Sequence, residues 1–203
     1  MKIIGLTGGI GMGKSTIASA FQRAGIPVFD ADATVHEMYR PGGAAVRAIG
    51  AVFPDVVVND AIDRAKLREL VVGDPSKFAT LERLVHPLVL RREIAAARRA
   101  RQRGRRALLI DNPLLFEMNL TPRDKATHER LLGQILVASA PEAIQVYRVR
   151  RRGKMSEAQI RAVIAKQMPD TEKRRRADVV IRTGLSRNHT LKQVRRLILD
   201  ILR

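Results

Sequence analysis

The sequence of 203 residues contains no cysteine and no tryptophan, and aromatic residues make up only 3% of it. The absence of cysteine excludes a disulfide scaffold and any cysteine-ligated zinc or iron–sulfur site. No apolar run reaches the ~18 residues that a membrane-spanning helix requires, because lysine or arginine interrupts each candidate. The first residues lead into glycines and Lys14 without a small-residue cleavage site, so we expect no targeting segment. These absences together favour a cytoplasmic protein.

Acidic residues are also scarce: 20 Asp and Glu stand against 38 Lys and Arg, which gives a formal net charge of +18. A charge of this sign favours an anionic partner, which is a nucleic acid, a membrane surface or a phosphorylated small molecule. Basic residues spread over solvated helix faces explain the same composition. Because 45% of the residues are hydrophobic, a chain of this length can bury a sizeable core, and disorder is excluded.

Five short apolar segments predict the strands of an α/β protein with a parallel sheet. They are residues 2–7, 26–29, 107–110, 134–138 and 179–181. Between the second and third segments, residues 31–104 have a helical pattern with glycine and proline breakers, so we expect a helical insertion there. Ser156-Glu157-Ala158-Gln159 is a capping-box sequence that starts a helix, and a stripe of apolar residues predicts a further helix at the C-terminus.

A phosphate-binding motif follows the first predicted strand and precedes a helix, as the motif requires. Its residues are Gly8-Gly9-Ile10-Gly11-Met12-Gly13-Lys14-Ser15, which match the P-loop pattern G-x-x-x-x-G-K-[ST]. The backbone N–H groups and the helix N-terminus of such a loop point at phosphates. Lys14 is expected to reach the β and γ phosphates, Ser15 to place its hydroxyl on Mg²⁺, and Thr16 to contact the α phosphate. The sequence therefore predicts a nucleotide site over Gly8 to Thr16.

Carboxylates follow two of the predicted strands, and ligands of open α/β sheets bind beyond the carboxyl ends of the strands. Asp32 is the candidate base that accepts the proton of an attacking hydroxyl, and Asp30 is a helix cap, a second carboxylate or a water ligand of the metal. The alternative is that one or both aspartates only cap the following helix. Asp111 ends the third strand in the Walker-B form and is a candidate for holding Mg²⁺ through a water. Glu117 follows it and either orients substrate or pairs with one of the many arginines.

Basic residues precede the capped helix at Ser156, where a mobile lid would supply charge to the transferring phosphoryl group and exclude water. Arg148 and Arg152 are four residues apart, so a helix would present them on one face. The alternative is a solvated basic face. None of the four histidines has metal-ligand spacing, and His86, next to Pro87, is either a buried histidine at a helix start or a substrate contact.

In the order and spacing of these motifs, nearly the whole chain resembles the dephospho-coenzyme A kinase family. The resemblance is carried by the P-loop with its preceding Leu6-Thr7, and by a set of further motifs. These are Asp30-Ala31-Asp32, Val85-His86-Pro87-Leu88-Val89, Pro113-Leu114-Leu115-Phe116-Glu117, the lid stretch from Arg152 to Ser156, Lys166-Gln167-Met168-Pro169 and Ala177-Asp178-Val179-Val180-Ile181. The chain departs from the family at Asn112, usually apolar, at Gly153-Lys154 in the lid turn, and at Thr183, often asparagine.

The resemblance implies a P-loop NTPase fold of the nucleoside-monophosphate-kinase type, with five parallel strands flanked by helices. It implies a core over residues 1–30, 104–147 and 177–203, a helical subdomain for coenzyme A over 31–103, and a lid over 148–176. The implied reaction transfers the γ-phosphoryl group of ATP, with Mg²⁺, to the 3′-hydroxyl of the ribose of dephospho-coenzyme A. The implied catalytic residues are Asp32, Lys14, Arg148 and Arg152; His86, Glu117 and Asp32 are expected to contact the acceptor, and Ser15 and Asp111 the metal.

Two other functions are compatible with parts of the sequence. Another P-loop kinase that acts on a nucleotide or a metabolite alcohol would have a different substrate subdomain. A basic RNA-binding protein would use the arginine surface, but the aromatic residues that stack on bases are scarce. We expect a monomer with ATP and dephospho-coenzyme A as its partners, and neither a specific nucleic acid nor a membrane.

Overall fold

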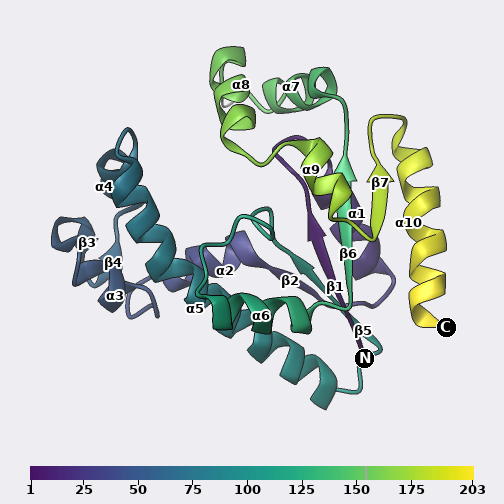
Figure 1. Ribbon diagram of the computed structural model, residues 1–203, viewed down its shortest axis with the longest axis horizontal. Helices are drawn as coiled ribbons and strands as arrows, with labels where there is room; N and C mark the ends of the chain where they lie inside the picture. Colours follow the sequence, from purple (N-terminus) through teal and green to yellow (C-terminus); the bar gives the residue numbers. More distant parts are fainter. Residues whose placement is uncertain (154) are drawn as a thin grey trace. The chain divides into compact units, whose positions relative to one another are not determined.

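Two compact units make up the computed structural model, which describes residues 1–153 and 155–203 (Figure 1). The first unit comprises residues 1–29, 97–117 and 132–203, and the second comprises residues 30–96 and 118–131. Lys154, part of the lid turn singled out in the sequence, lies outside the described residues. No helix within the described ranges is both long and apolar enough to cross a lipid bilayer.

A five-stranded sheet forms the centre of the first unit, in the order β2-β5-β1-β6-β7. Its strands are β1 (Lys2–Thr7), β2 (Val28–Asp30), β5 (Ala107–Asp111), β6 (Gln134–Ser139) and β7 (Val179–Arg182). The pairs β1–β5, β1–β6 and β6–β7 are parallel. All five strands were predicted, because buried parallel strands are short apolar runs bounded by turn residues. The predicted fold class is confirmed.

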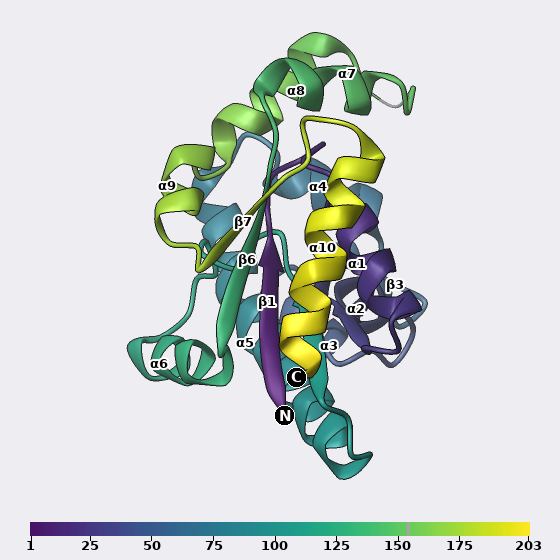
Figure 2. The same cartoon turned by 90° about the vertical axis from the view of Figure 1, so that its right-hand side faces the viewer.

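Helices cover both faces of this sheet, as Figure 2 shows for α1 (Lys14–Arg23) and α10 (Arg187–Leu202) on one side and α9 (Asp170–Arg175) on the other. The core on the α1 side contains Ile17 and Phe21 of α1, Val194 of α10, and Ile4 of β1. Each is nearly inaccessible to solvent. Successive residues of a strand point to opposite faces, so Ile181 of β7 joins this core and Val180 faces α9.

The segment from β6 to α9 contains α7 (Glu142–Arg150) and α8 (Glu157–Lys166), which pack on each other through Val146, Val149 and Ile160. The predicted capping box at the start of α8 is present: the Ser156 side chain accepts from the Gln159 N–H, and the Gln159 side chain accepts from the Ser156 N–H. The spacing predicts that Arg148 and Arg152 share one helix face, and this prediction is wrong, because α7 ends at Arg150 and Arg152 lies beyond the helix. The left-handed Gly153 follows in the same turn.

The second unit is mainly helical and begins with Asp30. Its helices are α2 (Ala31–Met38), α3 (Val46–Gly50), the 3₁₀ turn η1 (Pro54–Val56), α4 (Arg64–Val71), most of α5 (Pro75–Gln102), and α6 (Pro122–Leu131). A small antiparallel pair, β3 (Val57–Val58) and β4 (Ala61–Ile62), was not predicted. Asn59 and Asp60 connect these strands with φ angles of 50° and 57°, which is typical of a two-residue hairpin turn.

The packing of the second unit includes a buried pair of polar side chains. Glu93 of α5 is inaccessible to solvent, and its carboxylate lies 3.2 Å from Nε2 of His128 on α6. The pair therefore ties α6 to α5. The division of the chain into a core, a coenzyme A subdomain and a lid, which the sequence suggested, stays a prediction about function.

Candidate active site

The P-loop follows β1 directly and its last residues begin α1. Gly13 is the N-cap of α1 with a left-handed φ of 86°, so the N–H groups at the start of the helix face the loop. Gly11 also has a left-handed φ, of 75°, and a Cβ there would lie 2.8 Å from the carbonyl oxygen of Gln145 in α7. Only glycine allows both this conformation and this approach. The loop is therefore packed against the backbone of α7.

Lys14 and Asp111 meet at the end of the sheet that carries the P-loop. The parallel register pairs Leu6 of β1 with Asp111 of β5, so the carboxylate ends its strand beside the start of the loop. The Lys14 Nζ atom lies 3.9 Å from Oδ1 of Asp111, and both side chains are mostly buried. Ser15 is the next residue of α1 and is exposed. This arrangement brings a cation, a hydroxyl and a carboxylate to one end of the sheet.

Arg148 of α7 is bound to the P-loop and to the segment after β7. Its Nη1 atom donates to the Gly11 carbonyl oxygen at 3.2 Å and to Oγ1 of Thr183 at 3.1 Å, and its Nη2 atom donates to the Thr183 carbonyl oxygen. The Thr183 hydroxyl donates in turn to the Met12 carbonyl oxygen at 2.6 Å. Thr183 is buried, and its hydrogen bonds with Arg148 hold the guanidinium group beside the P-loop. Arg152, by contrast, is exposed in the turn after α7.

Glu117 is held by a buried lysine that the sequence did not single out. The Lys173 side chain on α9 is 1% exposed, and its Nζ atom lies 2.6 Å from Oε1 of Glu117 and 3.3 Å from the Pro113 carbonyl oxygen. The same Glu117 oxygen accepts from the Met168 N–H at 3.3 Å. The sequence suggested that Glu117 either orients substrate or pairs with an arginine. The structure shows a pairing with a basic residue, but that residue is the lysine Lys173. The contact of Glu117 with substrate stays a prediction.

Asp30 and Asp32 lie at the start of α2 in the second unit. Asp30 is the N-cap, and its Oδ1 atom accepts from the Ala33 N–H at 2.8 Å, which confirms the capping interpretation. Asp32 stands in the first helical turn and is exposed. An acidic residue in the first turn also interacts favourably with the helix dipole. Its role as a base stays a prediction.

His86 is buried, as one interpretation of the sequence held, but it lies within α5 and not at a helix start. Its Nδ1 atom accepts a hydrogen bond from the Asn119 N–H at 2.6 Å. Burial lowers the pKa of His86 from 6.5 to about 4, because the charged imidazolium would lose its hydration. The neutral ring is therefore the form present near neutral pH, and its contact with substrate stays a prediction.

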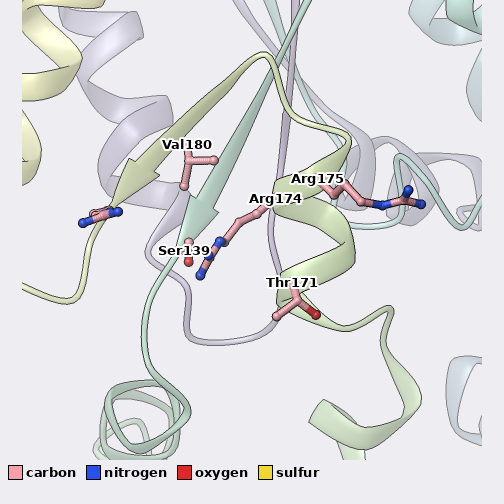
Figure 3. A pocket seen from close by; sticks show the side chains of 6 residues that line it. Ser139, Thr171, Arg174, Arg175 and Val180 are labelled. Atoms are coloured by element: carbon pink, nitrogen blue, oxygen red, sulfur yellow. The ribbon is translucent and has the colours of Figure 1, made fainter.

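A cavity of about 420 Å³ lies against α9 and β7, and none of its lining residues belongs to the P-loop. Figure 3 shows Arg174 extending toward Ser139, whereas Arg175 points the other way. Both arginines have acidic partners on their own helix: Arg174 lies 3.7 Å from Asp170, and Arg175 lies 2.9 Å from Glu172. Their charges do not converge on one point, so the P-loop remains the better phosphate site.

The residues at the P-loop fit a magnesium ion by their chemistry. Mg²⁺ prefers oxygen ligands and takes few of them from the protein, since phosphates and waters supply the rest. The Ser15 hydroxyl and the Asp111 carboxylate are such donors at the phosphate end of the sheet. Within residues 1–153 and 155–203, no group of three or more His, Asp or Glu side chains forms a separate metal cluster.

The strand order, the P-loop after β1 and the aspartate that ends the neighbouring strand β5 define a P-loop kinase. The dephospho-CoA kinase family model matches residues 2–188. A dephospho-CoA kinase from Gluconobacter oxydans is 44% identical over 98% of this chain and 96% of its own length. One from Bartonella quintana is 43% identical over the full length of both chains.

A crystal structure from Thermus thermophilus is similar to this chain at a TM-score of 0.82 and 33% identity, covering 100% of this chain and 98% of its own. The match therefore extends over the whole fold and is not confined to the P-loop. The chain belongs to the dephospho-CoA kinase family.

Proposed function

We propose that this chain transfers the γ-phosphoryl group of ATP to the 3′-hydroxyl of the ribose of dephospho-coenzyme A, giving coenzyme A and ADP. This is the last step of coenzyme A synthesis. The observation that carries the proposal is the P-loop with Lys14 and Asp111 at the same end of the sheet, in a chain whose family is established over its whole length. The cytoplasmic location and the monomeric state expected from the sequence remain predictions.

The phosphates of ATP would lie in the P-loop, where Gly8 to Gly13 expose backbone N–H groups and α1 presents its N-terminus. Lys14 would contact the β and γ phosphates, and Thr16 the α phosphate. Ser15 directly and Asp111 through a water would hold Mg²⁺, which neutralises charge on the β and γ oxygens when it is bound. The existing approach of Lys14 Nζ to Asp111 supports this placement of the two groups.

Asp32 would accept the proton of the 3′-hydroxyl while the hydroxyl oxygen forms its bond to the γ phosphorus. The bond between that phosphorus and the bridging oxygen breaks, and ADP leaves with the bridging oxygen. The exposed carboxylate of Asp32 supports the role, since a base must be accessible to the hydroxyl. His86 and Glu117 would contact the acceptor.

Arg148 and Arg152 would supply positive charge to the transferring group. Arg148 is already fixed beside the P-loop by Gly11 and Thr183, so its charge needs no large movement to act on the phosphates. Arg152 lies in an exposed turn, and closure of the segment over bound ATP would bring its charge to the site.

A coupled assay of ADP release tests the proposed function. Purified protein with Mg-ATP should turn over dephospho-coenzyme A and leave adenosine, AMP and shikimate unused. The Lys14→Ala variant, purified in the same way, controls for a contaminating kinase and should lose the activity. Turnover of another acceptor in place of dephospho-coenzyme A would instead identify a different small-molecule kinase.

A further inference from the structure

The short link between α8 and α9 is attached to the first unit at two adjacent residues. The side-chain oxygen Oε1 of Gln167 accepts a hydrogen bond from the Ile10 N–H of the P-loop at 2.9 Å. The N–H of the next residue, Met168, donates to the Glu117 carboxylate, which the buried Lys173 holds in place. The Gln167 side chain therefore reaches the P-loop from a segment that is itself fixed.

Ile10 receives a second contact from the same part of the chain. Its half-buried side chain packs against the apolar cluster of Val146 and Val149 from α7 and Ile160 from α8. Both the backbone and the side chain of this P-loop residue are thus bound by the α7–α8 segment and the link that follows it. A movement of the α7–α8 segment would therefore change the position of Ile10.

Gly9 lies directly against the Gln167 amide. A Cβ at Gly9 would stand 2.6 Å from Oε1 of Gln167, while the other nearest atoms, Cδ of Gln167 and Oε1 of Gln145, are 3.7 and 3.8 Å away. Gly9 is not among the glycines with a left-handed φ, so its backbone accepts an alanine. An added methyl group would therefore displace one specific atom, the Gln167 oxygen that accepts from Ile10.

The N–H groups of a P-loop form the cradle for phosphates, and their directions decide how well the empty loop fits its ligand. Gln167 gives the Ile10 N–H a neutral acceptor from the protein, which fixes the plane of the Gly9–Ile10 peptide. The fixed peptide plane then sets the direction in which the backbone enters the rest of the loop, from Gly11 to Ser15. A loop ordered before binding loses less conformational freedom when the phosphates arrive.

We infer that Gln167 is a positioning residue: its side-chain oxygen preorganises the P-loop for phosphates and couples the loop to the α7–α8 segment. The inference rests on the proposed function only in taking a nucleotide as the ligand of the P-loop. It is independent of which acceptor receives the phosphoryl group.

A double-mutant cycle on the full chain tests the inference, with the dissociation constant of Mg-ADP measured by calorimetry. Gln167→Ala and Gly9→Ala should each weaken ADP binding by about three- to tenfold, the effect of losing one ordinary hydrogen bond. The double variant should be no weaker than either single variant, because both changes remove the same contact. Losses that multiply in the double variant, or single variants that bind as wild type does, would overturn the inference.

Gln193→Ala is the matched control, because the Gln193 side-chain amide also makes one hydrogen bond to the backbone, here donating to the Arg182 carbonyl oxygen, without contacting the P-loop. It should bind Mg-ADP as the wild type does. A loss equal to that of Gln167→Ala would show a general effect of removing such bonds and would contradict the positioning role.

Hydrogen exchange at the Ile10 amide, measured by NMR on the nucleotide-free protein, separates positioning from a loss of folding. Gln167→Ala should speed this exchange several-fold while amides in β1 keep their rates. Gln167→Glu retains an acceptor oxygen and should restore the protection. Unchanged exchange in Gln167→Ala would refute the inference. Neither the binding measurement nor the exchange measurement contains a phosphoryl acceptor. Failure of dephospho-coenzyme A turnover would therefore leave both results unaffected and would refute the proposed function alone.

Discussion

Replacing Lys173 with methionine should destabilise the first unit strongly. Methionine keeps most of the volume of this 1%-exposed side chain but removes the charge that lies 2.6 Å from Glu117. Glu117 would retain the Met168 N–H as a partner of Oε1, and its Oε2 atom is already buried without a hydrogen bond within the described residues. Removing one member of a buried ion pair costs ~3–5 kcal/mol, since it leaves an uncompensated charge.

For a protein of this size, a loss of that magnitude lowers Tm by roughly 6 to 20 °C. Urea unfolding followed by circular dichroism would give the free energy of unfolding directly. The second variant, Lys173→Met with Glu117→Gln, removes both charges and should recover ~2 kcal/mol or more of the loss. Arg161→Met, which breaks a solvent-exposed pair with Glu142 and Glu157, is the control and should change stability far less. If Lys173→Met lowers the free energy of unfolding by less than ~1 kcal/mol, the reasoning is refuted, because a loss that small is typical of a solvent-exposed ion pair.

Two further predictions concern the proposed site, and a third concerns stability. Asp32→Ala should lower kcat by roughly a hundredfold or more while the dissociation constant of ATP stays within about twofold, as expected for a base that acts on the acceptor; an equal loss of ATP affinity would point to a structural role. Lys14→Ala should weaken ADP binding by about ten- to a hundredfold in calorimetry, since a charged donor to phosphate is lost, and wild-type affinity would contradict its placement.

His86 stays neutral in the folded protein down to about pH 4, whereas the unfolded chain takes up the proton near pH 6.5. The lowered pKa of His86 therefore contributes to the free energy of unfolding in full above pH 6.5. As the pH falls toward 4, this contribution of roughly 3 kcal/mol is lost. In urea unfolding, His86→Gln should show a shallower fall over this range, and curves that run parallel to those of the wild type would refute the assignment.

The sheet and the P-loop could be predicted because the sequence pattern that each requires lies within a few consecutive residues. A buried parallel strand needs a short apolar run, and a phosphate loop needs glycines followed by Lys14 and Ser15, so each can be read within a few residues. The pairing of Leu6 with Asp111 then follows from the parallel register, which brings the Walker-type carboxylate to the P-loop.

Two features of the second unit were missed for different reasons. The β3–β4 hairpin has a local signal, since Asn59 and Asp60 are residues that tolerate a left-handed φ and stand between apolar pairs. The continuation of α5 through Pro87 has none, because proline usually ends or begins a helix. The sequence therefore placed His86 at a helix start.

The buried charges and the Gln167 contact could not be predicted, because they join segments far apart in the chain. Lys173 stands among five consecutive charged residues, 172–176, and its burial depends on α9 packing against the sheet. Nothing within a local window distinguishes it from the exposed arginines beside it. The partner of the Ile10 N–H is likewise decided by where the link after α8 returns to the P-loop.

The most direct test of the central claim is the identity of the product. Incubation of the protein with Mg-ATP and dephospho-coenzyme A, followed by ³¹P NMR, should show a new phosphomonoester signal at the ribose 3′ position in equal amount to the ADP formed. Release of ADP without this signal, or phosphorylation at another hydroxyl, would contradict the assignment of this chain as the kinase that completes coenzyme A.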